Sequence, residues 1–312
     1  MTDSVHYAPI GSLTLAYETF GKAANPPVVL IMGLGAQMLV WPDALCEHLA
    51  RQGYYVVRFD NRDVGLSSRF HGQGESSLGR ILFRMSLGLS PRAGYELDTM
   101  AGDTLGLMDH LGLSSAHIIG ASMGGMIAQV IASHHPSRVR SLGLIMSNSG
   151  APGIARADWR LLAGVVLQAQ RRGSGDDLDA KARALSAIGS QRFPTPHATI
   201  RQRLARAQMR GCDSSGAARQ LAAILATGDR RSLLQRICCP TTVLHGDEDR
   251  LIPSEGGMDQ ARHIQGARFE LIHGMGHDFP PPLLSRIARL LTENLATAQS
   301  ATRFVASARS AG

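Results

Sequence analysis

The stretch "IIGASMGGM" (118–126) places one serine, Ser122, among glycines and small apolar residues. The residues before it are typical of a strand and those after it of a helix, which is the setting of the nucleophile elbow G-x-S-x-G. In such an elbow the hydroxyl lies at a helix N-terminus, whose dipole favours developing negative charge. Gly120 and Gly124 are the two glycines that this motif requires, because a Cβ at either position would collide with the neighbouring strand or helix. Ser122 is therefore a candidate nucleophile, although a serine in such a run could also be filler.

A serine at its ordinary pKa needs a base to activate it, and the base needs an acid to orient it. Two later loops offer both: "GDEDRLIP" (246–253) follows the predicted strand "TTVLH", and "HGMGHDFP" (273–280) follows the predicted strand "RFELI". Both loops follow the carboxyl ends of strands, the edge at which open-sheet proteins place their sites. The candidates that these loops carry are Asp247, Asp249, His273 and His277.

Three motifs give the sequence a family resemblance: "FDNRDVGLS" (59–67), "GASMGG" (120–125) and "GMGH" (274–277). Over essentially its whole length the chain resembles the α/β-hydrolase superfamily, in particular the serine carboxylesterase branch that contains aclacinomycin methylesterase. The order serine, acid, histidine is the one found in that superfamily. The resemblance implies that Asp249 is the acid of G-x-x-D-x-x-x-P and His277 the base of G-x-G-H. Asp247 would then cap a turn, His273 would be a core histidine, and 60–67 would form a structural loop.

An oxyanion hole in such a site needs two backbone N–H groups. The residue after the nucleophile, Met123, is the first donor expected. The second is Leu34, in the loop "MGLGAQ" (32–37) after the predicted strand "VVLIM". Relatives usually have His-Gly where this chain has Met32 and the next glycine, so a side chain that normally braces the loop is missing. We expect Gly35 to let the loop pass close to substrate, with a plain turn as the alternative.

The wider pattern predicts the elements that hold these loops. Apolar runs typical of strands alternate with helical patterns over residues 1–150, and the alternation resumes over 229–298. This predicts an α/β fold with a mostly parallel central sheet flanked by helices. Residues 151–228 show helical patterns alone, so we expect a helical cap inserted into the α/β domain. The last predicted helix ends near Ala298, and 299–312 are expected to form a frayed tail.

The cap is expected to roof the substrate pocket. Trp159, Leu162 and Val166 recur at helical spacing, and a second apolar stripe runs through 217–228. These side chains could simply pack among the cap helices, but a cap above the strand ends would turn some of them toward Ser122. We expect an apolar pocket with its arginines facing outward. The apolar stretch 78–91 should pack beneath the cap or line the pocket, with membrane contact as the alternative.

Composition excludes several other classes of protein. Hydrophobic residues make up 44% of the 312, enough for a large core, and the net charge is +7. Residues 151–230 contain 13 Lys or Arg and 6 Asp, so one segment carries the basic surplus. We expect a solvated helical surface there, with attraction to anionic substrates or lipid headgroups as the alternative. Few aromatic residues accompany the basic ones, so nucleic-acid binding is not expected. His273 and His277 have a zinc-like spacing, but the "GMG" between them disfavours a helix, so no metal is expected. The start of the chain lacks secretory features, and we expect a cytoplasmic protein without membrane contact.

The sequence thus predicts a serine hydrolase that cleaves carboxylic esters through an acyl-enzyme, without a cofactor. The expected partner is a small ester with a hydrophobic group, and the oligomeric state stays undetermined. Acyltransferase or perhydrolase, lactonase, carbon–carbon bond hydrolase and proline iminopeptidase activities use the same serine chemistry and remain alternatives. A catalytically silent binding protein on the same fold is the alternative from another class.

Overall fold

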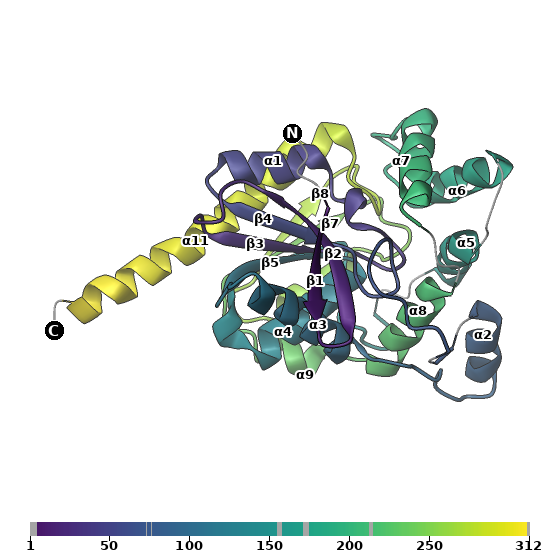
Figure 1. The fold of residues 1–312 in the computed structure, drawn as a ribbon, viewed down its shortest axis with the longest axis horizontal. Helices are drawn as coiled ribbons and strands as arrows, with labels where there is room; N and C mark the ends of the chain where they lie inside the picture. Colours follow the sequence, from purple (N-terminus) through teal and green to yellow (C-terminus); the bar gives the residue numbers. More distant parts are fainter. Residues whose placement is uncertain are drawn as a thin grey trace.

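A computed structural model describes residues 5–72, 74–75, 77–154, 158–170, 175–211 and 215–310. The side chains of residues 159, 165, 168–170, 175–176 and 299–310 lie outside this description. An eight-stranded sheet with the order β1-β2-β4-β3-β5-β6-β7-β8 forms the centre (Figure 1). Strand β2 pairs antiparallel with both β1 and β4, and all neighbours from β4 to β8 in this order pair in parallel. The strands are β1 (His6–Ile10), β2 (Leu13–Phe20), β3 (Pro27–Ile31), β4 (Tyr55–Phe59), β5 (Ala116–Ala121), β6 (Val139–Ile145), β7 (Thr241–Gly246) and β8 (Arg268–Ile272).

The sheet is covered on both faces, because its central strands are apolar on both sides. In β3, Val29 and Ile31 belong to the core below the sheet, while Val28 and Leu30 belong to the core above it. Helices α3 and α4 lie below the sheet in Figure 1, with α9 near them, and α1 and α11 lie above it. The mostly parallel sheet flanked by helices predicted from the sequence is therefore confirmed. The core helices are α1 (Asp43–Arg51), α3 (Leu97–His110), α4 (Met123–His134), α9 (Arg231–Leu234), α10 (Glu255–His263) and α11 (Leu284–Ser310).

Between β6 and β7 the chain forms a set of helices at one end of the sheet (Figure 1). We call α5 to α8 the insertion. Another helix, α2, which follows β4 in the chain, packs beside them through Leu78 and Ile81. No helix in the described residues is both long and apolar enough to cross a membrane. These helices are α2 (Leu78–Ser86), α5 (Trp159–Gln170), α6 (Gly175–Ile188), α7 (His197–Met209) and α8 (Gly216–Thr227).

The end of the chain differs from the expectation. Helix α11 does not stop near Ala298 but continues to Ser310, and Figure 1 shows it projecting from the body of the molecule. The sequence from 299 onward contains Ala and Arg, which favour helices, and the first glycine after α11 begins is Gly312. Helical propensity therefore extends through the segment that was expected to fray.

Candidate active site

Ser122 lies on a sharp turn between β5 and α4. Its backbone has φ 56° and ψ −122°, a left-handed conformation that is strained for any residue with a Cβ. The turn is possible because its neighbours are glycines: a Cβ on Gly120 would overlap the carbonyl oxygen of Gly124, and one on Gly124 would overlap the carbonyl oxygen of Ile31. The elbow expected from the sequence, with its strained serine and its two required glycines, thus has the predicted geometry.

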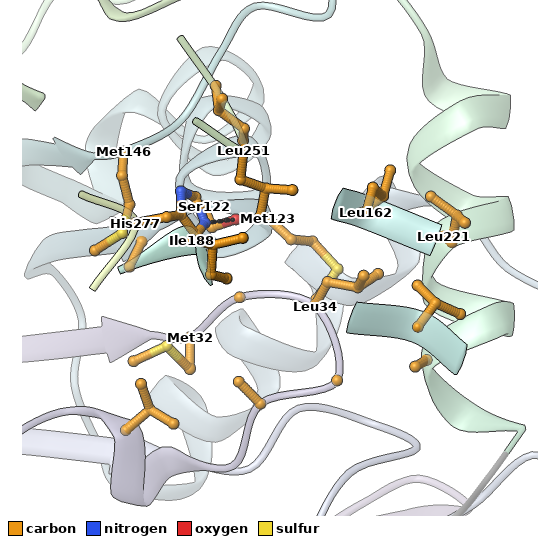
Figure 2. A pocket seen from close by; sticks show the side chains of 18 of the residues that line it. Met32, Leu34, Ser122, Met123, Met146, Leu162, Ile188, Leu221, Leu251 and His277 are labelled. Carbon is orange, nitrogen blue, oxygen red and sulfur yellow. Dashed lines mark hydrogen bonds between the residues drawn. The ribbon is translucent and has the colours of Figure 1, made fainter. Parts of the chain in front are cut away.

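His277 reaches Ser122 from the loop after β8. Its Nε2 lies 3.1 Å from Ser122 Oγ, a contact drawn in Figure 2, and its Nδ1 lies 2.8 Å from Asp249 Oδ2. The backbone N–H of His277 also donates to the carbonyl oxygen of Ile188 at the end of α6, over 2.8 Å. Because the imidazole contacts a hydroxyl on one nitrogen and a carboxylate on the other, it can take the Ser122 proton while the carboxylate holds its tautomer.

Asp249 is a buried carboxylate held in the loop after β7. Its Oδ1 accepts the backbone N–H groups of Leu251 (3.0 Å) and Ile252 (2.9 Å), while its Oδ2 faces His277 and lies 3.4 Å from His245 Nε2. Burial alone would raise the pKa of Asp249, but the charge of His277 and hydrogen bonds from His245 and His277 bring that pKa down to about 2. Asp249 is therefore a carboxylate at neutral pH and can stabilise a positive imidazolium.

The rival residues form a separate pair. His273 Nδ1 lies 2.8 Å from Asp247 Oδ2, and Asp247 Oδ1 accepts the backbone N–H of Gly274 over 2.7 Å. The His273 side chain is 66% exposed, so it is not the core histidine that was expected, whereas Asp247 does cap the turn. Of the four candidates, only Asp249 and His277 connect to Ser122. The described residues contain no group of three or more His, Cys, Asp or Glu side chains able to hold a metal.

The loop after β3 lies directly against the serine. A Cβ on Gly33 would come 2.9 Å from Ser122 Cβ, so the loop can approach this closely only with glycine there. The N–H of Met123, the first residue of α4, has no acceptor within its helix, and no acceptor for the Leu34 N–H occurs among the described residues. Both N–H groups are thus free to bind an oxyanion. Figure 2 shows the Leu34 and Met123 side chains in the same cavity as Ser122.

Gln220, on α8, braces this loop, and sequence reasoning missed it. Its Oε1 accepts the N–H of Gly35 over 2.7 Å, and its Nε2 donates to the carbonyl oxygen of Arg62 over 2.8 Å. The Gln220 side chain is fully buried. Gly35 itself has φ +64°, and a Cβ on it would lie 3.1 Å from Ala217 Cβ. Gly35 is therefore needed because the oxyanion loop passes close to α8. Gln220 of α8 braces this loop in place of the histidine side chain that relatives have there.

The insertion also ties down other parts of the site. Gln37 Nε2, just after the oxyanion loop, donates to the carbonyl oxygens of Ala207 and Gly211 at the end of α7. Below the oxyanion loop, residues 60–67 have the structural contacts expected of them. Asp60 Oδ1 accepts the Met38 N–H over 2.8 Å, and Asp63 forms a buried bidentate pair with Arg219 of α8. Both aspartates are thus committed to backbone and arginine partners.

Ser122 opens into a cavity of about 970 Å³ between the sheet edge and the insertion. Leu162 and Val166 of α5 line it, as expected, and Gly35 does too, whereas the Trp159 side chain lies outside the described residues. The other apolar side chains that line it from the insertion include Ile188, Leu204, Leu221, Ile224 and Leu225. Figure 2 shows Ile188 and Leu221 in the pocket with Ser122.

The expectation that the arginines of the cap face outward is wrong for Arg219 of α8, which is 1% exposed and pairs with Asp63. Arg203 of α7 and Arg230, two residues after the cap, line the cavity. Arg230 is 1% exposed, and it donates to the carbonyl oxygens of Gly228 (2.7 Å) and Asn148 (3.0 Å) and to Gln129 Oε1 (2.9 Å). Burial lowers the pKa of Arg230 to about 10. Neutral oxygen acceptors satisfy this guanidinium inside the protein, which a count of charges along the sequence cannot reveal.

A family model described as "alpha/beta hydrolase fold" matches residues 26–280. The chain belongs to this alpha/beta hydrolase fold family. Among curated proteins, rhodomycin D methylesterase DauP of Streptomyces sp. (strain C5) is 26% identical over 287 residues, covering 86% of this chain and 90% of the relative. The 3-oxoadipate enol-lactonase 2 of Acinetobacter baylyi is 26% identical over 261 residues, covering 83% and 85%. With esterases and lactonases as relatives, this member of the family is a hydrolase.

The solved structures agree on the fold. The enol-lactonase of Burkholderia xenovorans LB400 superposes with a TM-score of 0.71 at 24% identity, covering 93% of this chain and all of that one. A likeness at this identity shows the alpha/beta hydrolase fold and nothing finer. The resemblance predicted from the sequence is confirmed for the family, and the methylesterase relative supports the branch that was predicted.

Proposed function

We propose that the protein is a serine carboxylesterase, in which Ser122, His277 and Asp249 form the catalytic triad. The observation that carries this proposal is the continuous chain of contacts from Ser122 Oγ to His277 Nε2 (3.1 Å) and from His277 Nδ1 to Asp249 Oδ2 (2.8 Å). The chain lies at the wall of a large apolar cavity. The methylesterase relative, which spans nearly the same length, supports an ester as the substrate.

The acylation half of the reaction follows from these contacts. Ser122 Oγ attacks the carbonyl carbon of the ester while His277 Nε2 takes the hydroxyl proton. The carbonyl oxygen becomes an oxyanion, and the N–H groups of Leu34 and Met123 donate to it. The tetrahedral intermediate then collapses: the bond to the alcohol oxygen breaks, and the alcohol leaves with the proton from His277. Asp249 stays ionised throughout and stabilises the imidazolium.

Deacylation repeats the same steps with water as the nucleophile. His277 takes a proton from the water as its oxygen attacks the acyl carbon, and it returns that proton to Ser122 Oγ when the acid leaves. No cofactor or metal takes part in this scheme. The insertion acts as the cap of the pocket, and its apolar lining favours small esters with a hydrophobic group. The expected cytoplasmic location stays a prediction from the sequence.

Lactone hydrolysis is the second candidate, because one curated relative is an enol-lactonase. A lactone is a cyclic ester, so the same attack by Ser122 would open the ring, and the leaving alcohol would stay attached to the acyl group. A panel of linear nitrophenyl esters, methyl esters and lactones separates the two activities by their kcat/KM values.

The test of the proposal is Ser122→Ala. We expect the variant to fold normally, to lose ester hydrolysis by several orders of magnitude and to lose labelling by a fluorophosphonate probe, because the covalent intermediate needs Oγ. Ser147→Ala is a matched control, since Ser147 is a neighbouring buried serine whose Oγ donates to the Ser122 carbonyl oxygen rather than facing His277. Turnover near the wild-type rate in folded Ser122→Ala would overturn the mechanism.

A further inference from the structure

The surface around α2 is unusually apolar. Of the ten large hydrophobic side chains that are exposed in the described residues, five lie within one short segment of α2 and the loop that follows it. Phe83 is 64% exposed and Leu87 is 58% exposed. Exposed apolar side chains gathered in one segment of a globular protein mark an interaction site. The five residues, which we call the α2 patch, are Leu82, Phe83, Met85, Leu87 and Leu89.

Helix α2 has two apolar sides, and only one of them is covered. Leu78 and Ile81 are buried against Val166 of α5 and Leu221 of α8. The α2 patch lies on the remainder of the helix and in the loop after it, and Figure 1 shows α2 at the edge of the molecule, beside α8 and near α5. None of the five residues of the α2 patch belongs to an apolar core of the described residues.

The α2 patch is continuous with the mouth of the cavity. Met85 is both 37% exposed and part of the cavity lining, and Val40 and Leu185 are likewise exposed and lining. Leu167, 51% exposed, lies on α5, which packs against α2. A surface that covered the α2 patch would therefore meet the entrance through which substrate reaches Ser122.

Charge determines what this surface can bind. Residues 77–92 include three arginines, at 80, 84 and 92, and no Asp or Glu. Arg80 and Arg92 are exposed, whereas Arg84 donates to the Ser90 carbonyl oxygen. Two copies of the chain facing each other through this patch would bring their arginines together, which disfavours a dimer. Exposed apolar side chains with an exposed arginine before and after them in the chain instead match an anionic bilayer surface, where headgroups bind the arginines and acyl chains contact the apolar side chains.

We propose that the α2 patch docks the protein on anionic lipid surfaces, with the mouth of the cavity toward the bilayer. From the sequence, membrane contact of 78–91 was only an alternative to packing beneath the cap, because the sequence does not show which side of α2 stays uncovered. The docking requires no spanning helix, and hydrophobic esters dissolved in the bilayer would enter the cavity from the same side. This inference does not rest on the proposed reaction, since docking needs neither Ser122 nor His277.

Co-sedimentation of the full chain with vesicles tests the proposal. We expect binding to vesicles of phosphatidylcholine with about one third phosphatidylglycerol, weaker binding to phosphatidylcholine alone, and weakening of the former by salt. Phe83→Ser with Leu87→Ser should lower the partition coefficient by about tenfold or more for each side chain. Arg80→Glu with Arg92→Glu should remove the preference for anionic vesicles. Tyr7→Ser, which changes an exposed side chain on β1, is the matched control and should bind as the wild type does.

Hydrolysis of a water-soluble acetate ester by the same variants separates this proposal from the proposed function. Phe83 and Leu87 do not line the cavity, so their double variant should keep wild-type turnover of that ester while losing the vesicles. Absence of vesicle binding by the wild type, or equal binding by the double variant, would overturn the docking. So would a wild-type dimer in analytical ultracentrifugation that the double variant abolishes, because a second copy would then occupy the patch.

Discussion

Replacing Asp249 by asparagine is the sharpest test of the site, because the structure dictates how the new amide must lie. Asp249 Oδ1 accepts two backbone N–H groups, from Leu251 and Ile252. The asparagine oxygen has to stay at that position, since an NH₂ group there would face two donors. The NH₂ group therefore replaces Oδ2 and faces His277 Nδ1, which lies 2.8 Å from Oδ2 in the structure.

This exchange reverses the tautomer of the imidazole. Nδ1 must accept from the NH₂ group, so the ring proton moves to Nε2, which then has no lone pair for the Ser122 proton. We expect kcat to fall on the order of 10⁴-fold, the loss that the same change causes in serine proteases with an equivalent triad. That loss corresponds to about 5 kcal/mol of activation free energy. The assay is steady-state hydrolysis of a nitrophenyl acetate, with the melting temperature of each variant as a check on folding.

Asp247→Asn is the matched control, because Asp247 forms the same kind of pair with His273 two residues earlier in the same loop. His273 is exposed and does not contact Ser122, so reversing its tautomer should leave kcat within about twofold of wild type. A larger loss with Asp247→Asn than with Asp249→Asn, or Asp249→Asn activity within tenfold of wild type, would refute the assignment of the acid.

Three further predictions concern the brace, the pocket and the core. Gln220→Leu should lower kcat about 10- to 100-fold with little change in KM for a small ester, because the Gly35 N–H loses its acceptor and the oxyanion loop loses its brace. A parallel loss of affinity for a boronic-acid inhibitor would distinguish this effect from general destabilisation. Leu162→Ala should change the chain-length preference of kcat/KM more than acetate ester turnover, and an unchanged preference profile would contradict the pocket assignment. Burial lowers the pKa of His117 to about 4, whereas its pKa in the unfolded chain is about 6.5, so the unfolded state binds more protons between these two pH values. The unfolding free energy should therefore drop by about 3 kcal/mol from neutral pH to pH 4. Denaturant titrations at both pH values should show a smaller drop for His117→Gln.

The sequence was most informative where chemistry depends on local geometry. The elbow at Ser122 could be predicted because its steric demands involve glycines two residues away on either side. The loops of Asp249 and His277 could be predicted as neighbours because each follows a strand of the same parallel sheet, and β7 and β8 do pair directly. The choice between the two aspartates and the two histidines came from the family resemblance, since both pairs have nearly the same spacing along the chain.

The residues that the sequence did not reveal act over long distances or on one side of a helix. Gln220 and Gly35 are 185 positions apart, and nothing near either residue indicates the other. The apolar pattern of α2 indicates a helix with hydrophobic residues, but both of its sides are apolar, so the pattern cannot say which side is covered. Arg230 was expected at the surface because its charge was considered without the carbonyl oxygens that loops can offer.

The hydrogen bonds between the insertion and the catalytic loops bear on how this protein could be re-engineered. Gln220 of α8 holds the oxyanion loop, and Ser190, after α6, donates through its Oγ to Asp278 beside the base. Helix α5 differs, since Leu162 and Val166 contribute to the cavity through apolar packing. Selection for new substrates can therefore draw on libraries confined to α5, where side-chain shape can be varied, whereas recombination that replaces the whole insertion would also dismantle the supports of catalysis.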